Sequence, residues 1–408
     1  MDSMNLKESV DKFVLEKKDY YQQWMFDEPI IISKTQNEKL SKIQKILYKL
    51  IYEFVSSYQK YKHLMPVDSK VASIIEVFNK KKYEVGTYRT DFVFDEGKKV
   101  KLIEITCRFA LNGVFLSELI NQIAFDFQKK KHPLIKVEKL FQPIYKCLEE
   151  RLKGLNSIYI LTGDDKRNES KIYTEIFNRI GYQIKNISYK DIENDINLMQ
   201  NSWVISELSF DEIKSLSETI IEKLASLNVI NDFRTVFLIH DKRFFSVLGK
   251  KELLENVLTT DEIDFFNEFY IPTYTYAEEK EIWKKAMLEK DKWILKHRAL
   301  GKSKKIYAGI VTEEDVWRKL FNDVQIKDMI LQEWIPQSSI TGSIAGENFK
   351  DYITGTLLYF DDNYFGLGDF RTSSHPVTNI VDHRKATSLI LSDDKELTAL
   401  ENENYIIY

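Results

Sequence analysis

Cysteine is scarce in this 408-residue sequence: Cys107 and Cys147 stand alone, without a C-x-x-C motif or a His/Cys cluster. Neither a disulfide framework nor a zinc site is therefore expected, and a reducing compartment suits the chain best. Long apolar runs are missing as well. Residues 1–21 carry a charge every few positions, and no stretch approaches the length that spans a bilayer. We therefore expect a cytoplasmic protein without a membrane partner.

The chain also lacks a large excess of charge of either sign. Its 59 Lys and Arg residues oppose 63 Asp and Glu residues, which gives a formal net charge of -4. This balance disfavours nucleic acid as the main ligand. A composition of 43% hydrophobic and 30% charged residues over this length indicates a globular protein of two or three packed units.

Hydrophobic periodicity separates helical from strand-like regions. Apolar residues three and four positions apart predict amphipathic helices at 38–62 and 113–131. Residues 155–245 instead alternate short apolar runs with a helical stretch, which is typical of a small parallel α/β unit. The expected elements of this unit are strands 157–163, 182–188, 203–208 and 235–241 and helix 169–181. No G-x-G-x-x-G motif follows the first strand, so a dinucleotide fingerprint is absent.

The segment 91–108, DFVFDEGKKVKLIEITCR, reads as a β-hairpin with acidic residues at unusual places. A turn of two or four residues, centred on Glu96-Gly97, would divide the side chains between two faces. Phe92, Phe94, Ile103 and Ile105 would lie on one face, and Arg89, Asp91, Glu104 and Thr106 on the other. Converging carboxylates suit Mg²⁺, which takes further ligands from substrate phosphates. An Arg89–Glu104 salt bridge on a solvent-exposed face explains the same residues equally simply.

Two later segments have features of a nucleotide site. The run 292–311 joins two strand-like stretches through a basic loop, and Lys296 near its start could reach phosphates that the loop covers. A surface hairpin is the simpler explanation, because no Walker motif is present. The strand 329–337 turns polar at Gln332-Glu333 before Pro336, as a segment beside a nucleotide base would.

Taken together, these segments and their order resemble the ATP-grasp ligases, in particular the circularly permuted branch represented by glutathionylspermidine synthase. The strand RTDF (89–92) is similar to the R-x-D-F strand of that family, and EITCR (104–108) is similar to E-x-N-x-R. The resemblance implies magnesium ligands at Asp91, Glu104 and Thr106, where Thr106 replaces the usual Asn. It also implies catalytic roles for Arg89 and Arg108.

Downstream segments extend the resemblance to roughly residues 85–380. HDKRFFSVL (240–248) is similar to an N-K-x-x-x-x-x-L stretch, and GDFRTSSHPVTNI (368–380) takes the place of a late strand with a catalytic arginine. The segments 293–309 and 331–336 are similar to the lid and to the hinge beside adenine. The residues implied to contact ATP are Lys242, Lys296, Gln332, Glu333 and Trp334, and the arginine on the late strand is Arg371.

The resemblance implies an α/β fold: a circularly permuted ATP-grasp core with a small parallel α/β domain and a lid. Residues 1–150 would hold N-terminal helices and the magnesium-binding hairpin. Residues 151–250 would form the α/β domain, and residues 251–408 the lid and the remainder of the core.

The activity implied is ATP-dependent ligation of a carboxylate to an amine through an acylphosphate, with ATP and Mg²⁺ as cofactors. The partners would be small molecules such as an amino acid, a polyamine or a peptide, and a homodimer is left open. Two rivals stay open: a catalytically decayed scaffold that binds nucleotide, and a kinase that phosphorylates a hydroxyl group. His240, His375 and His383 are open as general bases, although a lone histidine is more often structural.

Overall fold

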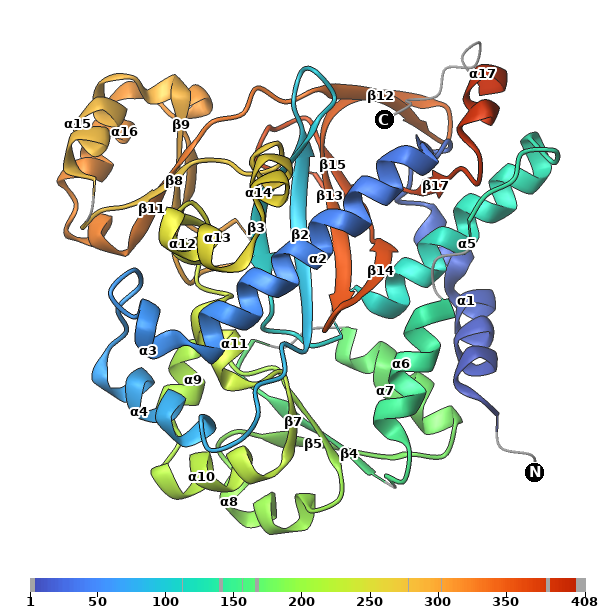
Figure 1. Cartoon of the computed structure of the whole chain (residues 1–408). Coiled ribbons are helices and arrows are strands. Elements are labelled where there is room, and N and C mark those ends of the chain that lie inside the picture. Colours follow the sequence, from blue (N-terminus) through green and yellow to red (C-terminus); the bar gives the residue numbers. More distant parts are fainter. Residues whose placement is uncertain are drawn as a thin grey trace.

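The structure is a computed structural model, and it describes residues 4–111, 113–138, 142–155, 157–165, 169–277, 279–301, 303–378 and 382–400. It is an α/β protein, as expected, in which parallel and antiparallel sheets occupy different parts of the molecule (Figure 1). Within these ranges, no helix is long and apolar enough to cross a membrane.

The largest sheet is antiparallel and lies in the middle of the molecule (Figure 1). Its strands follow the order β16-β15-β13-β2-β3, and β12 and β14 also pair with the long strand β13. The bounds are β2 Thr87–Phe94, β3 Val100–Thr106, β12 Ser339–Ile344, β13 Glu347–Phe360, β14 Asn363–Leu367, β15 Phe370–Ser373 and β16 Arg384–Ala386. The hairpin β2–β3 thus shares a sheet with strands from the far end of the chain.

One long helix covers a face of this sheet. The helix predicted at 38–62 is α2 (Lys34–Ser56), which ends before the short α3 (Tyr58–Tyr61). Ser33 caps α2, since its side chain accepts a hydrogen bond from the backbone N–H of Gln36. Figure 1 shows α2 lying across β2, β3 and β13, and its apolar stripe shares one core with the hairpin. The stripe consists of Leu40, Ile43, Ile46, Leu47, Leu50, Ile51 and Phe54.

Other helices pack beside the central sheet. The second predicted helix is α5 (Val114–Lys131), which contacts α1 (Leu6–Gln22). Nearby, β1 (Ile30–Ile32) pairs in parallel with β17 (Ser388–Ile390). The remaining elements here are α6 Gln142–Leu152 and α17 Leu397–Leu400. Helix α4 (Ser69–Phe78) instead contacts α10 (Glu218–Ser226) and α11 (Phe233–Leu238).

The parallel sheet has the order β5-β4-β6-β7, with bounds β4 Ser157–Thr162, β5 Gln183–Ser188, β6 Trp203–Ser206 and β7 Asn228–Ile230. Its helices are α7 Glu169–Arg179, α8 Ile192–Asp195, α9 Phe210–Ser215 and α10 Glu218–Ser226. Three of the predicted strands and the helix are confirmed, but a strand at 235–241 was wrong. Most of that segment belongs to helix α11 (Phe233–Leu238), which Asp232 caps through the N–H of Arg234. Every residue of α11 is buried, so it lacks the polar face that distinguishes a helix from a buried strand.

A small antiparallel sheet forms the part that we call the lid. Its order is β10-β9-β11-β8, with bounds β8 Thr273–Thr275, β9 Trp293–His297, β10 Ile306–Ala308 and β11 Met329–Glu333. Helices α15 (Lys280–Leu288) and α16 (Glu314–Asn322) pack on it around a core of their own that contains Trp283, Trp293 and Trp317. Helices α12 (Phe244–Leu248), α13 (Lys251–Val257) and α14 (Thr260–Asn267) lie between the lid and α2: α12 contacts β8, and α13 and α14 contact α2. The domain boundaries at 150 and 250 stay a prediction.

Candidate functional site

The hairpin register differs from the predicted one in two ways that cancel. Asp95 and Lys99 face each other around a turn of three residues, 96–98, so the predicted turn of two or four residues was wrong. Such a turn alone would put Asp91 and Glu104 on opposite faces of the sheet. A β-bulge then shifts the register between Asp91 and Phe92, so that Asp91 lies directly opposite Glu104 and Arg89 opposite Thr106.

The bulge also moves Ile103 out of the core. Leu102 takes the buried position beside Phe92, while Ile103 is half-buried and lines a cavity. The prediction that Ile103 lies on the apolar face was therefore wrong. The backbone carbonyl of Ile103 accepts a hydrogen bond from Nζ of Lys296 at 3.0 Å. The extra residue thus connects the hairpin to the lid.

Asp91 is buried between two arginines. Nε of Arg89, on the same strand, donates to Oδ1 of Asp91 at 2.9 Å. Arg371, from β15, donates to Oδ2 of the same carboxylate. The two guanidinium groups lie on the cavity side of the central sheet, and only 6% of the Asp91 side chain is exposed. Three of the residues predicted from the sequence therefore form one ion-pair cluster.

Glu104 has a different counter-ion. Oε1 of its carboxylate lies 3.1 Å from Nζ of Lys242, whose side chain is 2% exposed. Burial opposes ionisation of Glu104, but the ammonium groups of Lys242 and Lys296 outweigh it and hold the pKa of Glu104 below its usual value. Glu104 is therefore a carboxylate at neutral pH.

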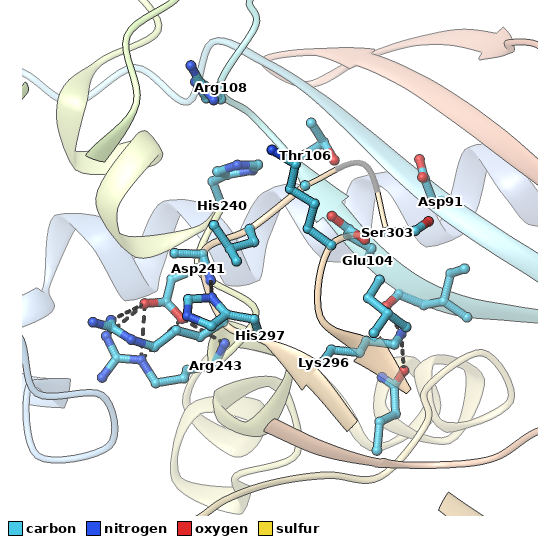
Figure 2. Close-up of a pocket in the computed structure, with 18 of the residues that line it drawn as sticks. Asp91, Glu104, Thr106, Arg108, His240, Asp241, Arg243, Lys296, His297 and Ser303 are labelled. Carbon is cyan, nitrogen blue, oxygen red and sulfur yellow. Dashed lines mark hydrogen bonds and ion pairs between the residues drawn. The ribbon is translucent and has the colours of Figure 1, made fainter. Parts of the chain in front are cut away.

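Lys296 lies at the junction of hairpin, lid and hinge. Its ammonium group donates to Oε1 of Gln332 at 2.7 Å, and the side-chain amide of Gln332 donates to Thr273. Burial lowers the pKa of Lys296 to about 8, although Glu104 opposes this shift. Figure 2 shows Lys296 and Glu104 pointing into the same space from different strands.

The sequence analysis missed an anchor beneath the lid. Asp241 is fully buried and accepts hydrogen bonds from Arg243 and from Arg298, the latter at 2.9 Å (Figure 2). The neighbouring Lys242 donates through its backbone to the carbonyl of Arg298 and through Nζ to that of Leu300. The run HDKR (240–243) and the pair His297-Arg298 at the end of β9 were the available signals, but their pairing depends on the fold.

A cavity of about 1130 Å³ between the central sheet, the lid and the parallel sheet is lined by Arg89, Asp91, Glu104, Lys296 and Arg371. Lys242 is not among its lining residues and adjoins the cavity through its contact with Glu104. We call the part around Asp91, Glu104, Arg89, Arg371, Lys242 and Lys296 the hairpin end. The hinge residues Gln332, Glu333 and Trp334 line the same cavity beside the aliphatic side chains of Ile271 and Ile294. Oε1 of Glu333 accepts a hydrogen bond from Tyr274 at 3.3 Å. The residues predicted to contact nucleotide are thus close to the predicted metal ligands.

Arg108 lies at the opposite end of the cavity, which we call the parallel-sheet end (Figure 2). Its guanidinium group is 3.5 Å from Asp165 and 3.8 Å from Glu212, and Nε donates to the carbonyl of Glu207. These partners follow β4 and β6 at the carboxyl edge of the sheet, where open α/β sheets commonly bind ligands. Arg108 is therefore separated from the other predicted arginines.

The carboxylates of the hairpin end fit a magnesium ion. Among the described residues no group of three or more His, Cys, Asp or Glu side chains is arranged to hold a metal. Mg²⁺, however, is commonly bound by one or two carboxylates together with substrate phosphates. Asp91 and Glu104 face each other across two strands, and the ion pair of Glu104 with Lys242 is made through Oε1. The hydroxyl group of Thr106 lies next on the same face.

Three comparisons with known proteins bear on the fold. The profile of the AnkG N-terminal domain family matches residues 43–238. No curated protein matches the chain. Among solved structures, the chain is similar to the apo form of a glutathione synthetase-like effector from Globodera pallida, at 12% identity and a TM-score of 0.62, over 93% of this chain and 96% of the other. This likeness confirms the α/β fold of the ATP-grasp, glutathione synthetase-like type, and the specific likeness to glutathionylspermidine synthase stays a prediction.

Proposed function

We propose that the protein is an ATP-dependent ligase that joins a small-molecule carboxylate to an amine. One observation carries the proposal: Asp91, Glu104, Lys296 and Arg371 converge from four strands on one cavity. The cavity volume of about 1130 Å³ is larger than the usual upper value for small-molecule sites, about 1,000 Å³. The cavity could therefore hold a second substrate beside a nucleotide.

The nucleotide would lie along the hinge and the hairpin. Its base would contact the segment Gln332–Trp334, and Lys296 would hold its phosphates above Glu104. A magnesium ion bound by Asp91 and Glu104 would withdraw charge from the phosphate oxygens. The basic loop after β9 would exclude water from the phosphates.

The chemistry requires positioned charges rather than a protein nucleophile. An oxygen of the substrate carboxylate attacks the γ-phosphorus, the bond to the bridging oxygen breaks, and ADP leaves. The amine nitrogen then attacks the acyl carbon, phosphate leaves, and the nitrogen loses a proton. Arg89 and Arg371 would stabilise the charge on the transferred phosphoryl group, which is the main contribution that proteins make to this reaction.

A nucleotide-binding protein without turnover is the second candidate. Both carboxylates of the hairpin end already have cationic partners within the chain, and Thr106 offers a hydroxyl where the related ligases have an amide. Each of these features weakens the attraction for metal. A scaffold of this kind would bind ATP and retain it unchanged.

A hydroxylamine trap separates the two candidates. A ligase supplied with ATP, Mg²⁺ and a panel of carboxylates converts hydroxylamine to a hydroxamate. A protein that only binds ATP forms no hydroxamate, and neither does a kinase that phosphorylates a hydroxyl group. We expect hydroxamate with the native protein and at least a hundredfold less with Glu104→Gln. Glu96→Gln, an exposed glutamate in the turn of the same hairpin, is the matched control and should react like the native protein. ATP binding without hydroxamate from any carboxylate would favour the second candidate.

A further inference from the structure

Lys242 combines complete burial with direct contact to a carboxylate of the hairpin end. Its side chain is 2% exposed, and Nζ lies 3.1 Å from Oε1 of Glu104 and 2.8 Å from the carbonyl oxygen of Leu300. The ammonium group thus sits between a carboxylate on the floor of the cavity and a carbonyl of the loop that covers it. A carboxylate and a carbonyl oxygen are ligands of the kind that a hard divalent cation takes.

Lys242 is also held firmly in this position. Its backbone N–H donates to the carbonyl of Arg298 at 2.9 Å. The preceding residue, Asp241, is fully buried and paired with Arg243 and Arg298. An ion pair with a buried carboxylate resists rearrangement, since separating its members leaves the Asp241 charge uncompensated. The ammonium group therefore stays beside Glu104 unless the anchor as a whole moves.

The charge of the hairpin end points the same way. Four cationic side chains, Arg89, Arg371, Lys242 and Lys296, surround the two carboxylates Asp91 and Glu104. These side chains carry more positive than negative charge, so each added divalent ion is repelled by the excess. A second ion would also have to share Oε1 of Glu104 with Lys242. On the other side of Glu104, Thr106 offers one hydroxyl oxygen as the next ligand along the strand.

We infer that this site takes a single divalent ion with its nucleotide, because the ammonium group of Lys242 stands in the place of a second one. The inference rests on the proposed function and makes it more specific. Asp91 and Glu104 would hold the ion, and Lys242 neutralises Oε1 of Glu104. Lys242 then supplies a fixed positive charge that stabilises the transition state, in addition to any role in nucleotide binding.

Counting bound manganese tests this inference without any measurement of turnover. Full-length protein is mixed with a limiting amount of a non-hydrolysable ATP analogue, and free Mn²⁺ is counted by EPR while a fluorescent ATP derivative reports nucleotide binding. We expect one Mn²⁺ per bound nucleotide in the native protein and in Thr106→Asn. We expect two in the double variant Lys242→Met/Thr106→Asn, because Oε1 of Glu104 becomes available.

The controls separate loss of fold, loss of function and failure of the inference. Lys49→Met removes an ion-paired lysine from the surface, 2.6 Å from Glu262, and should keep one ion. Two ions in the native protein or in Thr106→Asn would overturn the inference and leave the proposed function standing. Thr106→Asn decides the question by itself if the Lys242 variant fails to fold. A native protein that binds no nucleotide would overturn the proposed function and this inference together.

Discussion

The two ends of the cavity are electrostatic opposites. At the hairpin end, cationic side chains surround the carboxylates of Asp91 and Glu104. At the parallel-sheet end, carboxylates and a carbonyl surround the guanidinium group of Arg108. The first arrangement favours an anionic ligand such as a triphosphate, and the second does not. Acidic and basic side chains therefore produce an excess of positive charge at the hairpin end and an excess of negative charge at the parallel-sheet end.

This difference bears on how Arg108 should be understood. The resemblance to E-x-N-x-R places it in one motif with Glu104, but the strand ends at Thr106 and the chain turns toward the parallel sheet. Arg108 then faces Asp165 and Glu212 instead of Asp91. A role toward the second substrate follows more naturally from this position than a role toward phosphate.

Asp91→Asn should have the largest effect, because it removes the buried anion that compensates two partly buried guanidinium groups. Breaking a buried ion pair from one side costs roughly 3 kcal/mol or more, so we expect the free energy of unfolding to fall by about 3 kcal/mol. Hydroxamate formation should also be lost. Chemical denaturation measures the first effect and the trapping assay the second.

Asp95→Asn is the matched control for this experiment. Asp95 belongs to the same hairpin and caps its turn by accepting a hydrogen bond from the N–H of Lys99 at 2.9 Å. It should cost about 1 kcal/mol at most, as expected for a single capping hydrogen bond. Equal losses of unfolding free energy in the two variants would mean that the ion pairs of Asp91 contribute no more than one capping hydrogen bond. The electrostatic difference between the two ends of the cavity would then have no effect on stability.

Arg108→Met should have a smaller effect and a different one. It removes the guanidinium group that lies near Asp165 and Glu212, so we expect a loss of about 1–2 kcal/mol in unfolding free energy. Nucleotide affinity should stay within twofold of the native value, since Arg108 lies at the parallel-sheet end. Titration with a fluorescent ATP derivative and denaturation measure the two quantities.

The control for Arg108 is Arg318→Met, which removes an exposed pair with Glu314 on α16 and should cost less than about 0.5 kcal/mol. If Arg108→Met weakened nucleotide binding tenfold, the two ends of the cavity would act as one phosphate site.

Much of the candidate site could be predicted from local sequence. Asp91, Glu104, Lys296, Gln332 and Glu333 lie on strands whose alternation is readable, and the structure places them around one cavity. The register illustrates the limit. A three-residue turn and a bulge at Ile103 cancel each other, and nothing in VKLIEIT marks the bulge, which Lys296 fixes from another part of the chain.

Long-range pairing accounts for the rest. Asp241 and Arg298 are far apart in the sequence and meet where the lid lies against α12, which contacts β8. The buried helix α11 was misread as a strand because burial on all sides removes periodicity. Alternation along strands thus identified Asp91, Glu104 and Lys296, whereas the pairing of Asp241 with Arg298 depends on a long-range contact that no local pattern marks.

The change of nucleotide affinity with pH should be the smallest of the predicted effects, and it depends on a single group of the hairpin end, Lys296. Only the ammonium form of Lys296 attracts phosphate, and its pKa is about 8 in the free protein. Affinity should therefore be constant below pH 8 and fall above it by up to about tenfold per pH unit.

The free energy of unfolding should rise with pH, where the nucleotide affinity falls. Between about pH 8 and the ordinary lysine value of 10.5, the unfolded chain binds more protons than the folded one, so Lys296 contributes an increase in stability as pH rises. Lys296→Met should bind nucleotide weakly at every pH, and a native affinity that is flat from pH 7 to 9 would show that Lys296 does not contact the phosphates.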